Sequence, residues 1–262
     1  MNKPLILVCN DDGITAPGIK ALVEVAQQFG EVVVVAPDSP QSGMGHAITI
    51  HHPLRLKKSS IFGDIEAYEC TGTPVDCVKM AKYIVLENRT PDLVLSGINH
   101  GSNVAINILY SGTMSAAMEG ALDGIPSIGF SLLDFTWEAD FSPTQFYAQQ
   151  LIQNVLDNGM VGGKLLNVNV PNLPLNEIKG MKVCRQANAR WKETFIKKED
   201  PMGKNYYWIS GEFINSDNGE DTDVKALDDG YISIVPSKFD LTDYDALKEA
   251  KWMENVNLEK KL

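Results

Sequence analysis

The sequence has few features of a nucleic-acid-binding, secreted or membrane-spanning protein. Its 262 residues include 23 Lys and Arg against 34 Asp and Glu, a formal net charge of −11. This acidic balance argues against binding to a nucleic-acid duplex, which needs a basic surface. No stretch approaches the roughly 20 apolar residues of a membrane helix, and the apolar run after Lys3 is too short for a secretory signal. We therefore expect a cytoplasmic protein without a membrane partner.

Cysteine is also scarce. Neither a CxxC pair nor a metal-like Cys/His spacing occurs among the four cysteines, Cys9, Cys70, Cys77 and Cys184. Scattered thiols of this kind are typical of reduced, packed cysteines in the cytosol. Hydrophobic residues make up 44 % of the chain, enough for a sizeable core, and the 22 % of charged residues does not indicate disorder.

The first half alternates buried strands with amphipathic helices. Residues 4–9, PLILVC, form a continuous apolar run, as expected for a strand buried on both faces. A helix is predicted at 18–30, closed by Gly30, from the apolar stripe of Ile19, Leu22, Val23 and Ala26. Further strands are predicted at 31–37, 65–70, 92–96 and 125–133. This alternation predicts an α/β fold with a mainly parallel sheet flanked by helices.

Two more helices are predicted in this half. The helix within 71–86 has clear start signals, with Thr73 as N-cap and Pro74 in the first turn. Its expected apolar stripe is Cys77, Met80, Ala81 and Ile84. The helix within 111–124 has an apolar face of Met114, Ala117, Met118 and Ala121.

The second half follows a different pattern. After a helix at 144–159 and a strand at 164–171, short strands are predicted at 181–186, 206–211 and 230–236. Polar, turn-rich stretches separate them, which predicts an antiparallel extension or arm instead of further βαβ units. A helix is expected from Thr242 onward, and a boundary is expected near residue 135.

Polar residues follow the expected parallel strands at their carboxyl ends, where ligands bind in α/β sheets. Asp11 and Asp12 follow the first strand, residues 39–46 the second, and residues 99–103 the strand at 92–96, while residues 111–113 open the next helix. If these strands are neighbours, the four loops converge on one rim of the sheet.

Asp11 and Asp12 stand side by side in the NDDG motif. Two neighbouring carboxylates cannot both stay ionised at close range without a compensating cation. Mg²⁺, Mn²⁺ and Ca²⁺ are hard cations that take oxygen ligands of this kind. We therefore predict a divalent-metal site, the alternative being an ordinary turn in which Asp12 caps the next helix.

The other three loops offer groups for an anion. Glycines in SGMG expose backbone N–H groups, and Ser42 can give a cation a neutral oxygen. Asn99 and Asn103 in SGINHGSN can supply a metal ligand and a phosphate donor. Ser111 and Thr113 open a helix, whose N-terminus favours anions. The alternatives are a flexible loop, a glycine turn and a plain helix cap.

Histidine contributes less to this prediction. His46 and His100 lie in the candidate loops, whereas His51 and His52 do not. No two histidines have helical spacing, so a metal site built on histidines is not expected. The roles of His46 and His100 stay open.

In this order, the motifs resemble the signature blocks of the SurE family of 5′/3′-nucleotidases. The blocks are NDDG, APDSPQSG, TGTPVDCV, SGINHGSN and YSGTMSAAMEG, followed by LLNVNVPNLP, IKGMKV, DPMGKNYYWISG and TDVKALDDGYISIVP. The resemblance covers nearly the whole chain. It implies a Rossmann-like catalytic core at 1–134 and a C-terminal region at 135–262 that completes the core and forms arms exchanged in a homodimer or homotetramer.

The resemblance also implies an activity and a site. The activity is divalent-metal-dependent hydrolysis of nucleoside monophosphates to nucleoside and phosphate, with exopolyphosphatase activity in some members. One cation per subunit, Mg²⁺ or Mn²⁺, is implied, with the ligands Asp11, Asp12, Ser42 and Asn99. The implied phosphate-contacting positions are Asn103 and Ser111, with Gly43, Asn99, Gly112 and Thr113 around them. The expected catalytic set is Asp11, Asp12, Asn103 and Ser111.

In the expected mechanism a cation binds a phosphoryl oxygen and lowers the pKa of a water molecule, with Asp11 the preferred general base. Direct attack by an aspartate is the alternative, but NDDG lacks the DxD spacing of haloacid-dehalogenase phosphatases. Two other function classes compete: a nucleotide-binding module without turnover, and a dinucleotide-dependent oxidoreductase. The oxidoreductase is disfavoured because GxGxxG does not follow the first strand.

Overall fold

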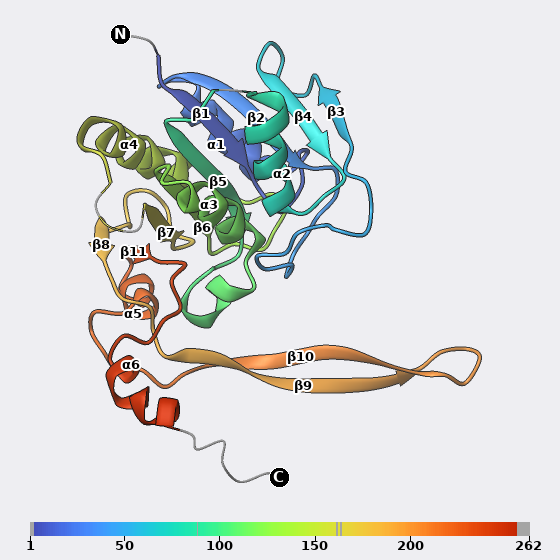
Figure 1. Ribbon diagram of the computed structural model, residues 1–262, viewed down its shortest axis with the longest axis vertical. Helices are drawn as coiled ribbons and strands as arrows, with labels where there is room; N and C mark the ends of the chain where they lie inside the picture. Colours follow the sequence, from blue (N-terminus) through green and yellow to red (C-terminus); the bar gives the residue numbers. More distant parts are fainter. Residues whose placement is uncertain (1–2, 88, 161, 163, 256–262) are drawn as a thin grey trace.

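The computed structural model describes residues 3–87, 89–160, 162 and 164–255. Within these residues a nine-stranded main sheet has the order β3-β4-β2-β1-β5-β6-β7-β11-β8, and β9 and β10 form a separate two-stranded arm (Figure 1). The strands are β1 (Leu5–Cys9), β2 (Glu31–Pro37), β3 (Leu56–Ser59), β4 (Glu66–Cys70), β5 (Leu93–His100), β6 (Ser127–Leu132), β7 (Leu165–Val170), β8 (Met181–Val183), β9 (Ala189–Glu199), β10 (Asn205–Asn215) and β11 (Ile232–Ser237). The helices are α1 (Pro17–Ala26), α2 (Pro74–Met80), α3 (Gly112–Leu122), α4 (Ser142–Asn158), α5 (Asp223–Asp228) and α6 (Ala246–Glu249), with π-helical η1 (Ala81–Val85) and the 3₁₀ helices η2 (Ala105–Leu109) and η3 (Ala250–Asn255).

The strand order reverses at the centre of the main sheet. β1 pairs in parallel with β2 on one side and with β5 on the other. The chain adds β2 and β4 on the first side, then returns to add β5, β6 and β7 on the second. In open α/β sheets the crevice for a ligand forms where the order reverses, outside the carboxyl ends of the strands. The ends of β1 and β5 border that point, and the predicted α/β fold with a mainly parallel sheet is confirmed.

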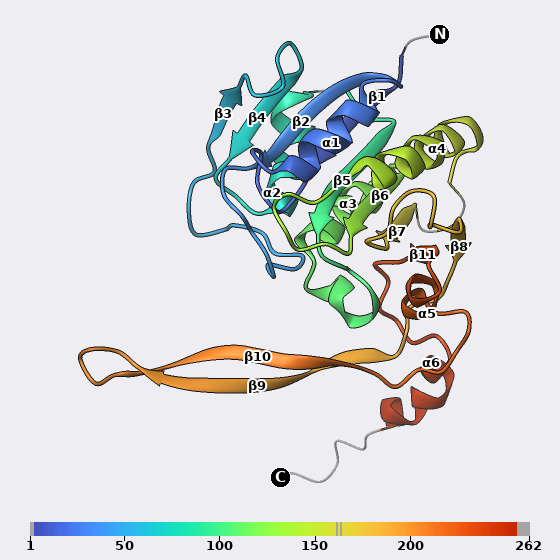
Figure 2. The same ribbon diagram turned by 180° about the vertical axis from the view of Figure 1, so that it is seen from behind.

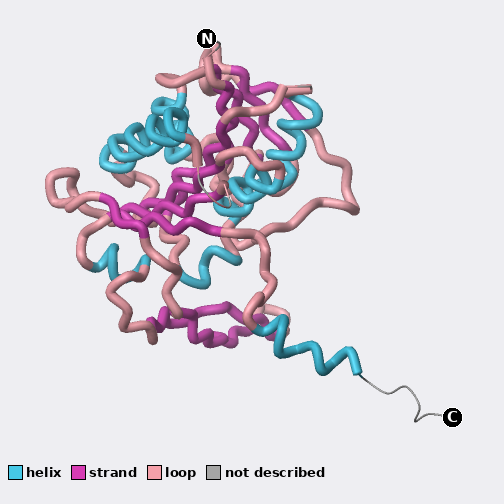
Figure 3. Tube along the Cα trace, turned by 60° about the vertical axis from the view of Figure 1, so that its left-hand side comes forward, coloured by secondary structure: helices cyan, strands magenta, loops and turns pink. Residues whose placement is uncertain are grey.

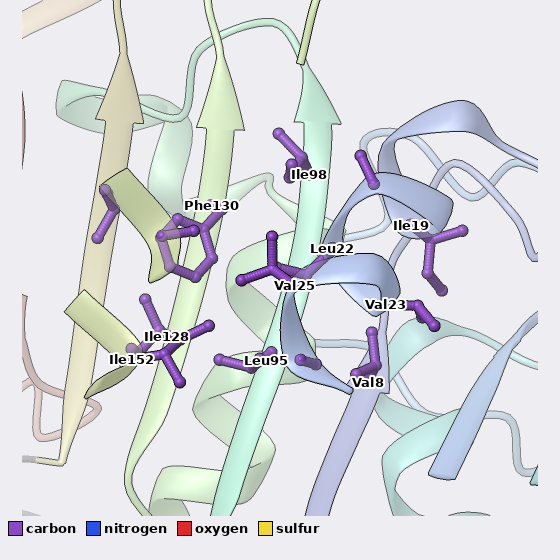
Figure 4. Close-up of a cluster of buried hydrophobic side chains, with 14 of the residues drawn as sticks. Val8, Ile19, Leu22, Val23, Val25, Leu95, Ile98, Ile128, Phe130 and Ile152 are labelled. Carbon is purple, nitrogen blue, oxygen red and sulfur yellow. The ribbon is translucent and has the colours of Figure 1, made fainter. Parts of the chain in front are cut away.

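Two helices cover each face of the sheet. In Figure 1 α2 and α3 lie in front of it, and in Figure 2, seen from behind, α1 and α4 lie in front. Side chains of β1 therefore alternate between two cores, one containing Val8 and the other Leu7. Figure 4 shows the first of these cores, where Val8 and Leu95 meet Leu22 and Val25 of α1. Each fully buried Leu or Ile contributes about 2 to 3 kcal/mol, which explains the continuous apolar run of β1.

Two helix predictions differ from the structure in detail. The helix predicted at 18–30 ends at Ala26, and Gly30 does not cap it. Gly30 is instead needed because a Cβ there would lie 2.0 Å from the carbonyl oxygen of Pro4. Ile84, expected on the buried stripe of the helix at 71–86, is exposed. The chain passes from α2 into the wider π-helical turn η1, which breaks the regular helical spacing on which that stripe was based.

The C-terminal half divides between the main sheet and the arm. The predicted strands at 181–186 and 230–236 correspond to β8 and β11, which pair in parallel with each other, and β11 pairs antiparallel with β7. The strand predicted at 206–211 lies in β10, which pairs antiparallel with β9 along its whole length. Figure 3 shows this arm set apart from the main sheet and joined to it by loops. The predicted antiparallel arm is therefore confirmed for the strand at 206–211, whereas the strands at 181–186 and 230–236 belong to the main sheet and not to the arm. The helix α5, inside the stretch read as turns, was missed.

The helix expected from Thr242 onward begins later in the structure, where α6 and η3 span residues 246–255. Residues 242–245 are not helical, and residues 256–262 lie outside the described residues. In the part of the chain that the structure describes, no helix is long and apolar enough to cross a membrane.

Candidate active site

Asp11 lies just beyond β1 and is buried, with 4 % of its surface exposed. The hydroxyl of Thr113, in the first turn of α3, donates a hydrogen bond to Asp11 Oδ1. Burial and the neighbouring charge of Asp12 raise the pKa of Asp11 to about 6, although the Thr113 hydrogen bond acts in the opposite direction. The site therefore contains a carboxylate that is costly to ionise unless positive charge is supplied.

Asp12 connects the loop after β1 to the end of β5. The backbone N–H of His100 donates to Asp12 Oδ2 over 3.3 Å. Burial raises the pKa of Asp12, and the hydrogen bond and charge of His100 oppose that rise. The alternative in which Asp12 caps the next helix is wrong, because the N-cap of α1 is Ala16, with no side-chain cap.

Gly112 brings the start of α3 against Asp11. A Cβ at this position would lie 2.6 Å from the Cβ and 2.9 Å from Oδ2 of Asp11. Ser111 is the N-cap of α3, and its Oγ accepts from the N–H of Met114 over 3.0 Å. The plain capping interaction considered for Ser111 is thus present, and it places the helix N-terminus beside the two aspartates.

The loop that carries Ser42 and Gly43 reaches the same rim. The N–H of Gln41 donates to the carbonyl oxygen of Asp11 over 2.7 Å, and the N–H of Gly45 donates to that of Tyr110 over 3.2 Å. Ser42 and Gly43 themselves are exposed at the tip of the loop. The four polar loops predicted from the sequence therefore converge, since direct hydrogen bonds join them.

Asn99 and Asn103 occupy different environments. The side-chain NH₂ of Asn99 donates to the carbonyl oxygen of Gly101 over 2.8 Å, which leaves its Oδ1 as the atom suited to a cation. Asn103 is buried, and its side-chain NH₂ donates to Ser131 Oγ over 2.8 Å. The backbone N–H of Asn103 donates to Asn169 Oδ1 over 2.7 Å.

Sequence reasoning missed the side chains that hold Asn103. Asn167 donates from its side-chain NH₂ to the carbonyl oxygen of Asn103 over 2.8 Å, and Asn169 donates to Asn167 Oδ1 over 2.9 Å. Both asparagines lie buried within β7. A signal was present, because amides in a continuous apolar strand need hydrogen-bond partners and so point to a polar neighbour.

The two histidines in these loops lie apart from each other. The Nδ1 of His100 lies 2.8 Å from the carbonyl oxygen of Thr136, and its ring stacks on Trp137 with the centroids 5.9 Å apart. His46 contacts α3, with Nε2 at 3.2 Å from Glu119 Oε2. Neither contact joins a histidine to Asp11 or Asp12.

The side chains at the rim fit a hard divalent cation. Among the described residues, no group of three His, Cys, Asp or Glu side chains could hold a metal ion. Two adjacent carboxylates are present instead, and the loops that reach the same rim carry the neutral oxygens of Ser42 and Asn99. An oxygen-only donor set of this composition suits Mg²⁺ or Mn²⁺ and not a soft metal.

Comparisons with known proteins agree with this geometry. Residues 6–193 match the family model of survival protein SurE. A 5′-nucleotidase SurE of Cytophaga hutchinsonii is 59 % identical over 94 % of this chain and 95 % of its own. One of Christiangramia forsetii is 57 % identical over 97 % of this chain and 98 % of its own. The crystal structure of a SurE protein from Aquifex aeolicus superposes with a TM-score of 0.83 at 44 % identity, covering 96 % of this chain and 100 % of that one. The similarity thus includes both the rim and the C-terminal half.

Proposed function

Since the chain belongs to the SurE family, we infer that it is a 5′-nucleotidase that hydrolyses nucleoside monophosphates to nucleoside and phosphate. The observation that supports this most strongly is the adjacent pair Asp11 and Asp12 at the point where the strand order reverses, in which Asp11 is buried and lies directly against the start of α3. Carboxylates beside a helix end that binds an anion would repel that anion unless a cation lies between them.

We propose that one divalent cation per subunit, Mg²⁺ or Mn²⁺, is held by Asp11, Asp12, Ser42 and Asn99. When bound, such a cation neutralises phosphoryl charge and lowers the pKa of a water molecule. The raised pKa of Asp11 supports this ligand set. A carboxylate that is costly to ionise is stabilised in its charged form by a bound cation.

The phosphate would lie at the start of α3. The N–H groups of Gly112 and Thr113 and the hydroxyl of Ser111 are the donors there, Asn103 approaches from the β5 side, and Gly43 from the loop after β2. Phosphoryl transfer depends mainly on positioning and charge neutralisation, which these donors supply. Asp11 would also accept the proton of the attacking water, because its carboxylate lies directly against the start of α3, where the phosphate would bind.

We also propose that residues 1–134 provide the catalytic part, and that the C-terminal region, residues 135–262, assembles subunits into a homodimer or homotetramer. The arm supports this because many of its apolar side chains are exposed, among them Phe195, Ile196, Trp208 and Ile209. The four free, buried cysteines are consistent with a cytoplasmic location. Polyphosphate ends are a further candidate substrate for the same site.

A substrate panel tests the proposal. The purified protein is incubated with AMP, GMP, 3′-AMP and polyphosphate, each with Mg²⁺, Mn²⁺ or EDTA, and released phosphate is measured. We expect release from nucleoside monophosphates that needs no NAD, stops with EDTA and returns with excess metal. Release that persists after exhaustive chelation would contradict the metal site. Nucleotide binding without release under every condition would instead support a binding module.

A further inference from the structure

The loop between β2 and β3, residues 38–55, carries Ser42 and Gly43 but contains no helix or strand. Its tip is exposed at Ser42, Gly43 and Met44. A Cβ built on Gly43 would meet no atom within 4 Å, so the tip has no packing of its own there. The N–H groups of Gln41 and Gly45, bonded to the carbonyl oxygens of Asp11 and Tyr110, hold the two ends of the tip. The position of the tip therefore also depends on how the chain beyond Gly45, the second limb of the loop, is anchored.

The second limb is anchored on the N-terminus of α2. The hydroxyl of Thr73 donates to the carbonyl oxygen of Ala47 over 2.7 Å. The N–H of Thr49 donates to the carboxylate of Asp76 at 3.1 Å from Oδ1 and 3.2 Å from Oδ2. Thr73 and Asp76 also form the capping box of α2, in which each side chain accepts from the other's backbone N–H. One pair of side chains thus caps the helix and holds the loop.

A third anchor comes from α3. Glu119 has only 3 % of its surface exposed, and its Oε1 and Oε2 contact Lys79 Nζ at 2.6 Å and His46 Nε2 at 3.2 Å. Burial alone would raise the pKa of Glu119, but the hydrogen bonds from His46 and Lys79 and the nearby charge of Lys82 hold the pKa below its usual range. Glu119 therefore stays ionised and joins the loop, α2 and α3.

We propose that Thr73, Asp76 and Glu119 are positioning residues for the hydrolytic reaction. They clamp residues 46–49 and thereby set where Ser42 and Gly43 lie relative to Asp11 and the start of α3. The inference rests on the proposed function. The TGTPVDCV motif, which contains Thr73 and Asp76, and the glutamate of SAAMEG, which is Glu119, do not touch the reacting groups. The proposed clamp gives both of them a role in the reaction. A displacement of about 1 Å in a positioned group can cost up to a hundredfold in rate.

The first test compares two helix caps. Thr73→Val removes the hydroxyl that caps α2 and holds Ala47, whereas Thr73→Ser keeps it. Thr222→Val is the matched control, because Thr222 is a buried N-cap of α5 whose Oγ1 accepts from Lys225 N at 3.2 Å and donates to the carbonyl oxygen of Gly219, not to residues 38–55. The second test compares Glu119→Gln with Asp123→Asn, since Asp123 lies at the end of α3 and pairs with Lys82.

Three measurements are made on each full-length variant. Amide hydrogen exchange reports opening of residues 38–50, Mn²⁺ titration reports affinity for the cation, and phosphate release from AMP gives kcat and KM. For Thr73→Val and Glu119→Gln we expect faster exchange confined to residues 38–50, weaker Mn²⁺ binding, and kcat/KM reduced about ten- to a hundredfold. Thr73→Ser, Thr222→Val and Asp123→Asn should leave all three within about twofold of the unmodified protein.

The inference is overturned if Thr73→Val and Glu119→Gln keep the exchange rate, the Mn²⁺ affinity and the kcat/KM of the unmodified protein. It is also overturned if Thr222→Val loses as much activity as Thr73→Val, because the effect would then follow from lost stability alone. Either result leaves the nucleotidase assignment intact, since the unmodified protein still turns over. Failure of the assignment would appear separately, as an unmodified protein that releases no phosphate from any nucleotide.

Discussion

Asp11, at the rim of the main sheet, is 4 % exposed, whereas Phe195 and Ile209 in the β9–β10 arm are each 68 % exposed. The rim buries charge, and the arm leaves apolar surface in water. Each arrangement is unfavourable for an isolated chain, because buried charge needs a counter-charge and exposed apolar area needs a cover. The rim and the arm therefore differ in what we propose completes them, which is a cation and a phosphate at the rim and the surface of another subunit at the arm.

Breaking the rim should have the largest effect. Asp12→Asn removes a charge that would hold the cation, and a metal site supplies several kcal/mol of charge stabilisation. We expect kcat/KM for AMP to fall roughly a thousandfold, while the thermal midpoint of the metal-free protein at pH 7 stays the same or rises, because the charge of Asp12 raises the pKa of Asp11. Phosphate release and thermal unfolding are measured beside Asp64→Asn, which changes an exposed aspartate in a turn of the main domain. Substantial turnover by Asp12→Asn would refute its assignment as a ligand.

Burying the charge of Asp11 should make the free energy of unfolding depend on pH. The pKa of Asp11 rises from an ordinary 3.8 to about 6 on folding, so without metal the free energy of unfolding falls as pH rises from about 4 to 6. By linkage this difference corresponds to about 3 kcal/mol above pH 6. Asp11→Asn should therefore be more stable than the unmodified protein at pH 7 in EDTA and equal to it near pH 4.

Adding metal should make the unmodified protein more stable than Asp11→Asn at pH 7. Saturating Mn²⁺ stabilises a protein that binds it in the folded state, so the unmodified protein should gain stability at pH 7 and Asp11→Asn should gain little. Chemical denaturation at pH 4 and pH 7, with EDTA or Mn²⁺, measures all four cases. An Asp11→Asn variant that is less stable than the unmodified protein in EDTA at pH 7 would contradict this account.

Changing the arm should have the smallest effect on the main sheet. Trp208→Glu places charge on an arm side chain that is 63 % exposed. We expect association between subunits to weaken about tenfold or more, while the stability of the dissociated chain changes by about 0.5 kcal/mol or less. Sedimentation equilibrium and unfolding at low concentration measure the two effects. Tyr83→Glu, an exposed aromatic on η1, is the control; equal weakening by both variants would argue against the arm as the interface.

The rim was more predictable from the sequence than the arm. Its signals are local, because a buried strand, a polar loop and a helix start follow one another, and the parallel order places those loops together. Asp11 and Thr113 were identified in this way, whereas Gly112 came from the family resemblance, and the contacts among the three confirm the convergence. The metal and phosphate roles of these residues remain predictions, since they depend on ligands.

Other features depend on contacts distant in the sequence. β9 was missed because nearly all of its side chains are exposed and neither face packs on a core. The alternation of apolar and polar residues that marks a half-buried strand is therefore weak. The buried amides of Asn167 and Asn169 find their partner in Asn103, more than sixty residues away. Ile84 was misplaced because a single π-helical turn cannot be read from apolar spacing.

Gly112 has a consequence for how this site can change over time. Its missing side chain lets the backbone of α3 rest directly on Asp11, so the helix start proposed to bind phosphate and the aspartate proposed to bind the cation are in direct contact. A methyl group at position 112 would push the start of α3 away from Asp11. The distance between that aspartate and the proposed phosphate site would then increase. An added side chain at Gly43 in the exposed loop tip would meet no neighbour, but the positive φ of 75° there also favours glycine, so both glycines at this rim resist replacement for different reasons.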